Sequence, residues 1–278
     1  MAAAFAVGWA VRLVHAPRAA ARPGAAGLGI GALTNFFDTL GVGSFAPTAA
    51  LFRAFRLVPD RLIPGTMNVG HALPSVAQAL IFIAVVAVDP GTLTAMIGAA
   101  IAGAWLGAGV VAGWSRRRVQ LGMGAALLVA AALLARQLLL GAPVGADALG
   151  LSGLRFVVGV AGNFMLGALM TLGVGLYGPC MILVTLLGMN ATAAFPIMMG
   201  SCGFLMPFAG WRFVAREAYS PGVALGLTLG GIPAVLVAAF VVRSLPLDVV
   251  RVLVLVVAVY TAAAMLWAAT RGQAAAGR

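Results

Sequence analysis

Polar residues with the spacing of a shared helix face interrupt the apolar stretches of this chain. Asn35, Asp38 and Thr39 stand at i, i+3 and i+4, so they share one face of a helix. An acid within a hydrocarbon-spanning segment is a candidate for proton relay or ligand binding. The alternative is that Asp38 is a hydrogen-bonded cap beside a glycine turn, with a structural role only.

A second polar group forms a stripe along the next apolar segment. Its members fall at i, i+3, i+7 and i+10: Asn68, His71, Ser75 and Gln78. His71 follows Arg61 by ten residues, which is about 15 Å along a helix and near the middle of a bilayer. A histidine there can relay a proton or pair with an anion, or it can bond to neighbouring helices. Pro74 predicts a local kink that would make room for a ligand.

A third group contains sulfur: Cys180, Met181, Met198, Met199, Cys202 and Met206. Thiolates and thioethers select soft metals such as Cu(I). However, Met is ordinary core filler and buried Cys behaves as a small hydrophobe, and neither a C-x-x-C motif nor a His pair accompanies the group. We therefore expect packing here, with no metal site and no cofactor.

The sequence carries no motif of a known enzyme class. It has no P-loop, HExxH or GxSxG phrase, and its sole Glu, Glu217, lies in a predicted loop. We therefore do not expect an enzyme. An intramembrane enzyme built on Asp38 and His71 is the alternative.

The segments that position these residues are built for lipid. Of 278 residues 63% are hydrophobic and 8% charged, whereas about a quarter of the residues in globular domains are charged. Uncharged windows recur, among them 62–88, 91–114 and 221–242, each long enough to cross about 30 Å of hydrocarbon. They lack the alternation of barrel strands. The composition predicts an all-α polytopic protein in contact with the lipid bilayer.

The charges lie at the ends of these segments. The net charge of +11 comes from 17 basic residues, all Arg, against 6 acids. We expect these arginines to anchor the protein at anionic headgroups, and we expect no nucleic acid partner. The apolar residues 1–11 precede their arginines, the wrong order for a signal peptide. We interpret residues 1–26 as an interfacial lead-in and 270–278 as a disordered tail.

One phrase occurs twice. TLGVGSFAP at 39–47 recurs as TLGVGLYGP at 171–179, and Pro64 matches Pro196 at the same offset of 132. Residues 27–141 and 153–269, joined by a linker at 142–152, are therefore predicted to be two repeats, an arrangement typical of secondary transporters.

Charge also indicates how each repeat crosses the membrane. Each repeat has one long stretch with the phrase, 27–57 or 154–187, and then three ordinary spans, which gives about eight spans. If each long stretch crosses once, nine arginines lie on one side and eight on the other. If each breaks at its phrase and returns, thirteen share the cytoplasmic side and four do not. The second layout obeys the positive-inside rule and makes the repeats inverted.

The repeated phrase suits a broken helix. Gly41, Gly43, Gly173 and Gly175 let the backbone leave helical geometry. Pro47 and Pro179 suit the first turn of a helix that restarts. Broken backbone at membrane depth is tolerated where it lines a cavity, and a restarting helix favours an anion at its first N–H groups. We expect the two breaks to converge on one site.

The two phrases, together with PGTMNVGH at 64–71, resemble the TauE/SafE family of membrane permeases over about residues 27–268. The resemblance implies a bacterial inner-membrane protein of about eight spans that moves sulfite, an organosulfonate or a related carboxylate by secondary transport. The predicted substrate site comprises Asn35, Thr39, Gly41, Gly43, Ser44, Asn68, His71, Asn163, Thr171, Gly173 and Gly175. Asp38 or His71 would couple transport to protons.

Two other functions stay open. The sulfur-bearing residues would suit a soft-metal transporter, and a membrane scaffold without transport is a further alternative. The sequence is compatible with a homo-oligomer.

Overall fold

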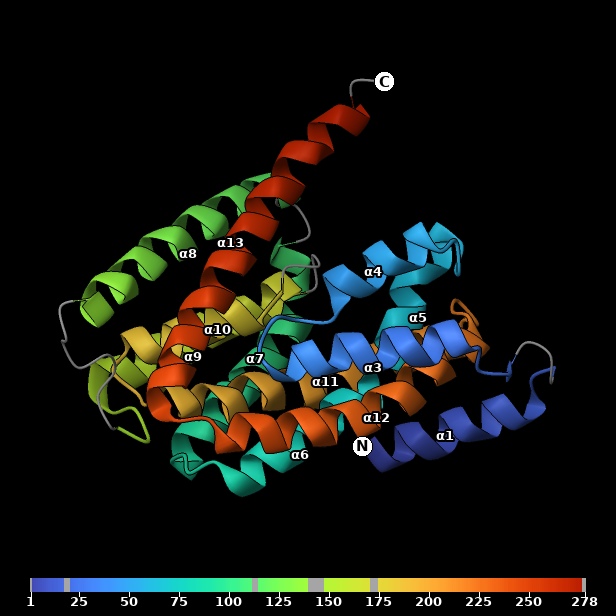
Figure 1. Ribbon diagram of the computed structural model, residues 1–278, viewed down its shortest axis with the longest axis horizontal. Helices are drawn as coiled ribbons and strands as arrows, with labels where there is room; N and C mark the ends of the chain where they lie inside the picture. Colours follow the sequence, from blue (N-terminus) through green and yellow to red (C-terminus); the bar gives the residue numbers. More distant parts are fainter. Residues whose placement is uncertain (1, 18–20, 112–114, 140–147, 171–174, 277–278) are drawn as a thin grey trace. The chain divides into compact units, whose positions relative to one another are not determined.

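The chain is α-helical throughout the residues that the structure describes. This computed structural model describes residues 2–17, 21–111, 115–139, 148–170 and 175–276 (Figure 1). Among them no sheet forms, and one isolated bridge pairs Ala148 with Met189. Within these described ranges, five helical segments are long and apolar enough to cross a membrane: Asp60–Val85, Gly153–Met170, Ala191–Ala215, Pro221–Val242 and Val252–Thr270. The all-α prediction is confirmed, and the five segments indicate a multi-pass membrane protein.

The helices follow the same order in the two halves of the chain. The first half contains α1 (Ala2–His15), α3 (Ala25–Thr39), α4 (Phe45–Ala54), the 3-10 turn η1 (Asp60–Leu62), α5 (Ile63–Gly70), α6 (Ala72–Val85), α7 (Pro90–Val111) and α8 (Arg116–Leu139). The second contains α9 (Gly153–Met170), α10 (Tyr177–Leu186), η2 (Ala191–Ala193), α11 (Ala194–Ala215), α12 (Pro221–Ser244) and α13 (Leu247–Ala276). Both α4 and α10 have ten residues, and α10 begins 132 residues after α4.

The chain folds into two compact units that do not coincide with the predicted repeats. Unit 1 comprises residues 1–84 and 202–244, and unit 2 comprises 85–201 and 245–278. In unit 1 the main helix pair is α3 with α12, and in unit 2 it is α7 with α9. Each unit therefore takes one helix of its main pair from each half of the chain.

Glycines let these paired helices approach closely. A Cβ added at Gly31 or Gly230 would collide with the backbone of Leu227 or Leu28 across the α3–α12 pair. In unit 2 a Cβ at Gly103 or Gly167 would collide with the backbone of the facing helix in the same way. Small residues at such contacts allow close packing of membrane helices.

The helix at the start of the chain packs within unit 1. In α1, Phe5 and Trp9 are buried, and Gly8 lies against the ring of Trp211. At the other end α13 continues to Ala276.

Candidate functional site

The first predicted break is present between α3 and α4. α3 ends at Thr39 and α4 begins at Phe45. The N–H of Gly41 donates to Asp38 O at 2.8 Å, and the N–H of Val42 donates to Phe37 O at 3.1 Å. This is a Schellman closure, which requires a left-handed residue after the helix. Gly41 supplies it with a φ of 94°.

The chain then restarts as a helix with proline in its first turn. Gly43 has a φ of 85°, a second left-handed position before α4. Pro47 lies in the first turn of α4, where its missing N–H costs no intrahelical bond. Ser44 is the buried N-cap residue, although its side chain makes no capping bond. The interruption predicted from the first phrase is therefore confirmed.

The second phrase also separates two helices. α9 ends at Met170 and α10 begins at Tyr177, with Pro179 in its first turn. Thr171 and Gly173 lie outside the described residues. Gly175 is described, and a Cβ there, as at Gly43, would meet open space.

His71 joins three elements of unit 1. It is fully buried between α5 and α6. Its Nδ1 lies 3.1 Å from Asn35 Oδ1 of α3, and its Nε2 lies 3.0 Å from Thr48 Oγ1 of α4. The ring of Phe45, in the first turn of α4, lies 5.9 Å from the imidazole between centroids.

Gln78 connects this network to the buried acid. Its Nε2 donates to Asp38 Oδ2 and to Thr39 Oγ1, both at 2.9 Å. The Thr39 hydroxyl donates in turn to the backbone oxygen of Asn35 at 2.8 Å. The bonds thus run from His71 through Asn35 and Thr39 to Gln78 and Asp38. The sequence placed the two polar groups on separate helices, and the fold brings them into one buried network.

The helix that carries His71 is interrupted where its proline predicts a kink. Pro74 has no N–H, so the carbonyl of Gly70 loses its usual donor four residues on. The hydroxyl of Thr228, from α12, donates to that carbonyl at 2.7 Å. The break lies at His71, between α5 and α6. Thr228 therefore satisfies a backbone group that would otherwise be unpaired in an apolar setting.

Two members of the predicted stripe do not join the network. Asn68 is only partly buried, and its Nδ2 donates to Pro64 O, one turn earlier, at 2.8 Å. Ser75 is buried, and its hydroxyl donates to Met206 Sδ at 3.1 Å. The stripe assumes a continuous helix, and the interruption at His71 separates Asn68 from the others. The structure therefore does not bring Asn68 together with His71, as its assignment to the same site required.

Asn163 lies in unit 2 and has its own small cluster. It is fully buried, and its Nδ2 donates to Met96 O at 2.7 Å and to Ser201 Oγ at 3.1 Å. The Ser201 hydroxyl donates to Ile197 O at 2.7 Å. Within the part of the chain that the structure describes, Asn163 Oδ1 has no hydrogen-bond partner. Such an acceptor fits a ligand or water that donates a hydrogen bond.

The sequence did not single out Thr48, Ser201 or Thr228, each of which contacts a key group of these clusters. All three are buried. Each is a lone hydroxyl within an apolar helix, and that is the signal that could have found them. A lone Thr or Ser also bonds readily to its own helix. A lone hydroxyl therefore does not distinguish a bond between helices from a bond within one helix.

The sulfur-bearing residues are buried in apolar surroundings. Cys180, Met181, Met198 and Met199 are fully buried, and Cys202 and Met206 nearly so. Among the described residues no three His, Cys, Asp or Glu side chains lie close enough to hold a metal ion.

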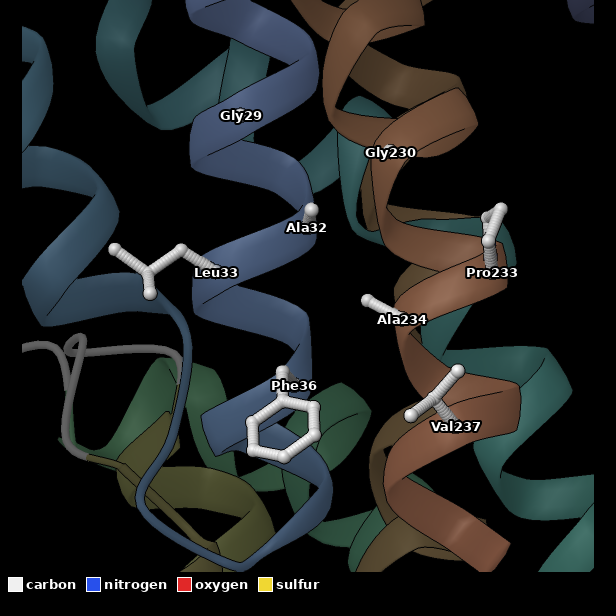
Figure 2. Close-up of a pocket in the computed structure, with 8 residues that line it drawn as sticks. All are labelled: Gly29, Ala32, Leu33, Phe36, Gly230, Pro233, Ala234 and Val237. Atoms are coloured by element: carbon white, nitrogen blue, oxygen red, sulfur yellow. The ribbon is translucent and has the colours of Figure 1, made fainter.

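The groove between α3 and α12 is separate from the polar network. Figure 2 shows it lined by Gly29, Ala32, Leu33, Phe36, Gly230, Pro233, Ala234 and Val237. The groove residues of α3 lie on a different face of the helix from Asn35 and Asp38. The lining is wholly apolar and includes no predicted site residue, as expected for a surface in contact with lipid.

No protein-family model, curated protein or solved structure matches this chain.

Proposed function

We propose that this protein is a secondary transporter of a small anion in a bacterial inner membrane. In this proposal about eight spans form two inverted repeats, and each repeat opens with a helix that breaks and returns. The five candidate spans, the interruption between α3 and α4 and the resemblance to TauE/SafE permeases support it. That resemblance favours sulfite, an organosulfonate or a related carboxylate as substrate.

The observation that carries the proposal is the buried network beside the first break. A carboxylate and an imidazole are costly inside a membrane segment, and proteins retain them there mainly for function. Asp38 and His71 are both buried and are linked through Asn35, Thr39 and Gln78. A scaffold would pack more stably with apolar residues at these positions.

The start of α4 is the proposed position of the anion. A helix leaves its first N–H groups without intrahelical acceptors and carries a partial positive charge there. Gly43 has open space beside it, and the buried Ser44 and Thr48 flank the first turn. Asp38 or His71 would carry the proton that accompanies the anion.

Flux into liposomes tests this function. The purified protein is reconstituted, and the uptake of labelled sulfite, sulfoacetate and acetate is measured with and without a pH gradient. We expect the gradient to stimulate the uptake of at least one anion, and Asp38→Asn to abolish that stimulation. Protein that moves none of the anions under either condition would contradict the proposal.

Soft-metal transport is the second candidate, because Cys180 and Cys202 are buried and the chain also has buried methionines. The Met206 thioether already accepts a bond from Ser75, which is a packing role. Cells that express Cys180→Ala or Cys202→Ala should keep the copper tolerance of cells with the unchanged protein if packing is the only role. Loss of tolerance in both would favour the metal.

A further inference from the structure

We infer that His71 is a neutral positioning residue, held as its Nδ1–H tautomer, that ties the start of α4 to α3, while the proton coupling belongs to Asp38. The assignment of coupling rests on the proposed function. The tautomer rests on hydrogen-bond geometry alone.

Asn35 decides which nitrogen of His71 carries the proton. The Asn35 Nδ2 donates to Gly31 O at 2.8 Å. Exchanging Nδ2 and Oδ1 would place the Asn35 oxygen against the Gly31 oxygen, so the orientation of the amide is fixed. Its Oδ1 therefore faces His71 Nδ1, 3.1 Å away. An oxygen acceptor at this distance requires a donor, so Nδ1 is protonated.

Thr48 completes the assignment. With the proton on Nδ1, the Nε2 of a neutral imidazole is an acceptor. The Thr48 hydroxyl, 3.0 Å away, is the donor. Both ring nitrogens then have a neutral partner of the correct type. A second proton on Nε2 would face a hydroxyl instead of a carboxylate, and a buried cation without a counter-charge is strongly unfavourable.

The charged groups on the surrounding elements have other positions or partners. On α3, Asp38 bonds to Gln78. On α4, the exposed Arg53 pairs with Asp60 at 3.0 Å. Arg212 lies in the last turn of α11. Within the described residues, the His71 side chain bonds to Asn35 and Thr48 and its ring lies beside Phe45, and all three are neutral.

His71 is therefore placed to hold the break between α3 and α4 in shape. It lies between α5 and α6. Its two bonds join Asn35, before the α3–α4 break, to Thr48, after it. A neutral amide with a donor in a similar place should perform part of this task, whereas only an ionisable group can couple a proton.

Nitrogen NMR tests the tautomer without any transport substrate. The full-length protein, labelled with ¹⁵N-histidine, is studied in phospholipid nanodiscs from pH 5 to 8. The chain has two histidines, and the exposed His15 is the internal control. His15→Gln assigns the signals. We expect His71 to keep one protonated Nδ1 and one unprotonated Nε2 throughout. A doubly protonated His71, or a proton on Nε2 alone, would overturn the inference.

Transport in liposomes tests the assignment of coupling. The ratio of sulfite uptake with a pH gradient to uptake without one is compared for His71→Asn, His71→Gln and Asp38→Asn. We expect both His71 variants to keep a ratio within about twofold of the unchanged protein at a lower rate, and Asp38→Asn to give a ratio of one. A ratio of one in the His71 variants with the ratio retained in Asp38→Asn would overturn the assignment. If the unchanged protein moves no anion, the proposed function fails while the tautomer is still decided by NMR.

Discussion

The two halves of the chain share a backbone plan but differ in chemistry. At the offset of 132, Asn35, Asp38, Thr48 and His71 correspond to Gly167, Met170, Cys180 and Gly203. Both halves place a ten-residue helix with an early proline after a long helix. Among the described residues, the buried chain of hydrogen bonds that links His71 to Asp38 lies in the first half. The duplication thus repeats the order of a long helix and a ten-residue helix, while Asp38 and His71 have no ionisable counterpart at the offset of 132.

The main helix pairs of the two units also resemble each other, because glycines allow close backbone contact in both. Gly31 in α3 and Gly167 in α9 each lie against the backbone of a facing helix. Gly29 and Gly98, on the same pairs, have nothing close to an added Cβ. The comparison separates glycines that packing requires from glycines that it does not.

The largest effect that we expect comes from adding a side chain to the glycines at these close helix contacts. Gly31→Ala and Gly167→Ala place a Cβ against backbone, which cannot move aside as a side chain can, so each should cost about 3 kcal/mol of folding free energy. Gly29→Ala and Gly98→Ala should be neutral or stabilising by about 0.5–1 kcal/mol. Reversible unfolding in mixed micelles measures all four. Equal losses at contact and control positions would refute the proposed difference.

The next largest effect should come from the two polar clusters, which should differ in their contribution to stability. Gln78→Leu removes a donor from the Asp38 carboxylate and from Thr39, and a hydrogen bond to a charged group is worth about 1.5–3 kcal/mol. Asn163→Leu removes two donations but also an unpartnered oxygen, so it should cost less. The same unfolding assay compares them. A larger loss for Asn163→Leu would show that unit 2 holds the more important cluster.

The interrupted helix offers a double-mutant test. Thr228→Val leaves the Gly70 carbonyl without a donor and should cost about 1 kcal/mol. Pro74→Ala restores an N–H to that carbonyl, so the threonine should matter less in its presence. Non-additive losses of stability in the double variant would support this. Strictly additive losses would mean that Thr228 acts elsewhere.

The smallest effect concerns the start of α7, where Asp89 precedes Pro90 as Ser220 precedes Pro221 at the start of α12. The N–H and hydroxyl of Thr92 both donate to Asp89 Oδ1, at 2.7 and 2.8 Å. These bonds lower the pKa of Asp89 below its usual value. The stabilisation should therefore be complete above about pH 4 and lost as the pH falls through the lowered pKa.

Asp89→Ser tests this cap because it keeps a capping oxygen without a charge. We expect the variant to lose the acid-dependent part of the stability and to match the unchanged protein most closely at low pH. Unfolding midpoints between pH 2 and 7 measure the difference. An unchanged acid response would place the titrating group elsewhere.

Much of the local structure followed from residue types. The glycines and Pro47 of the first phrase predicted a break between two helices, because the Schellman turn needs a left-handed residue and a restarting helix tolerates proline. The long apolar windows predicted both helices and a location in a membrane. The spacing of Asn35, Asp38 and Thr39 predicted a shared face, and all three are buried.

Other assignments depended on contacts that spacing does not encode. Asn68 belongs to the same periodic stripe as His71, but the helix breaks between them and Asn68 bonds to its own turn. Thr48 and Thr228 are lone hydroxyls in apolar helices, and that signal does not identify their partners, which lie on other helices.

The sequence by itself determined the helices, their apolar character and the interruption at Gly41 and Gly43, since these follow from local geometry and from the cost of charge in hydrocarbon. Only the tertiary structure decided that α3 pairs with α12 and α7 with α9, and that His71 meets both Asn35 and Thr48. Hydrogen bonds between helices are set by which backbones approach closely, and that depends on packing among segments far apart in the chain.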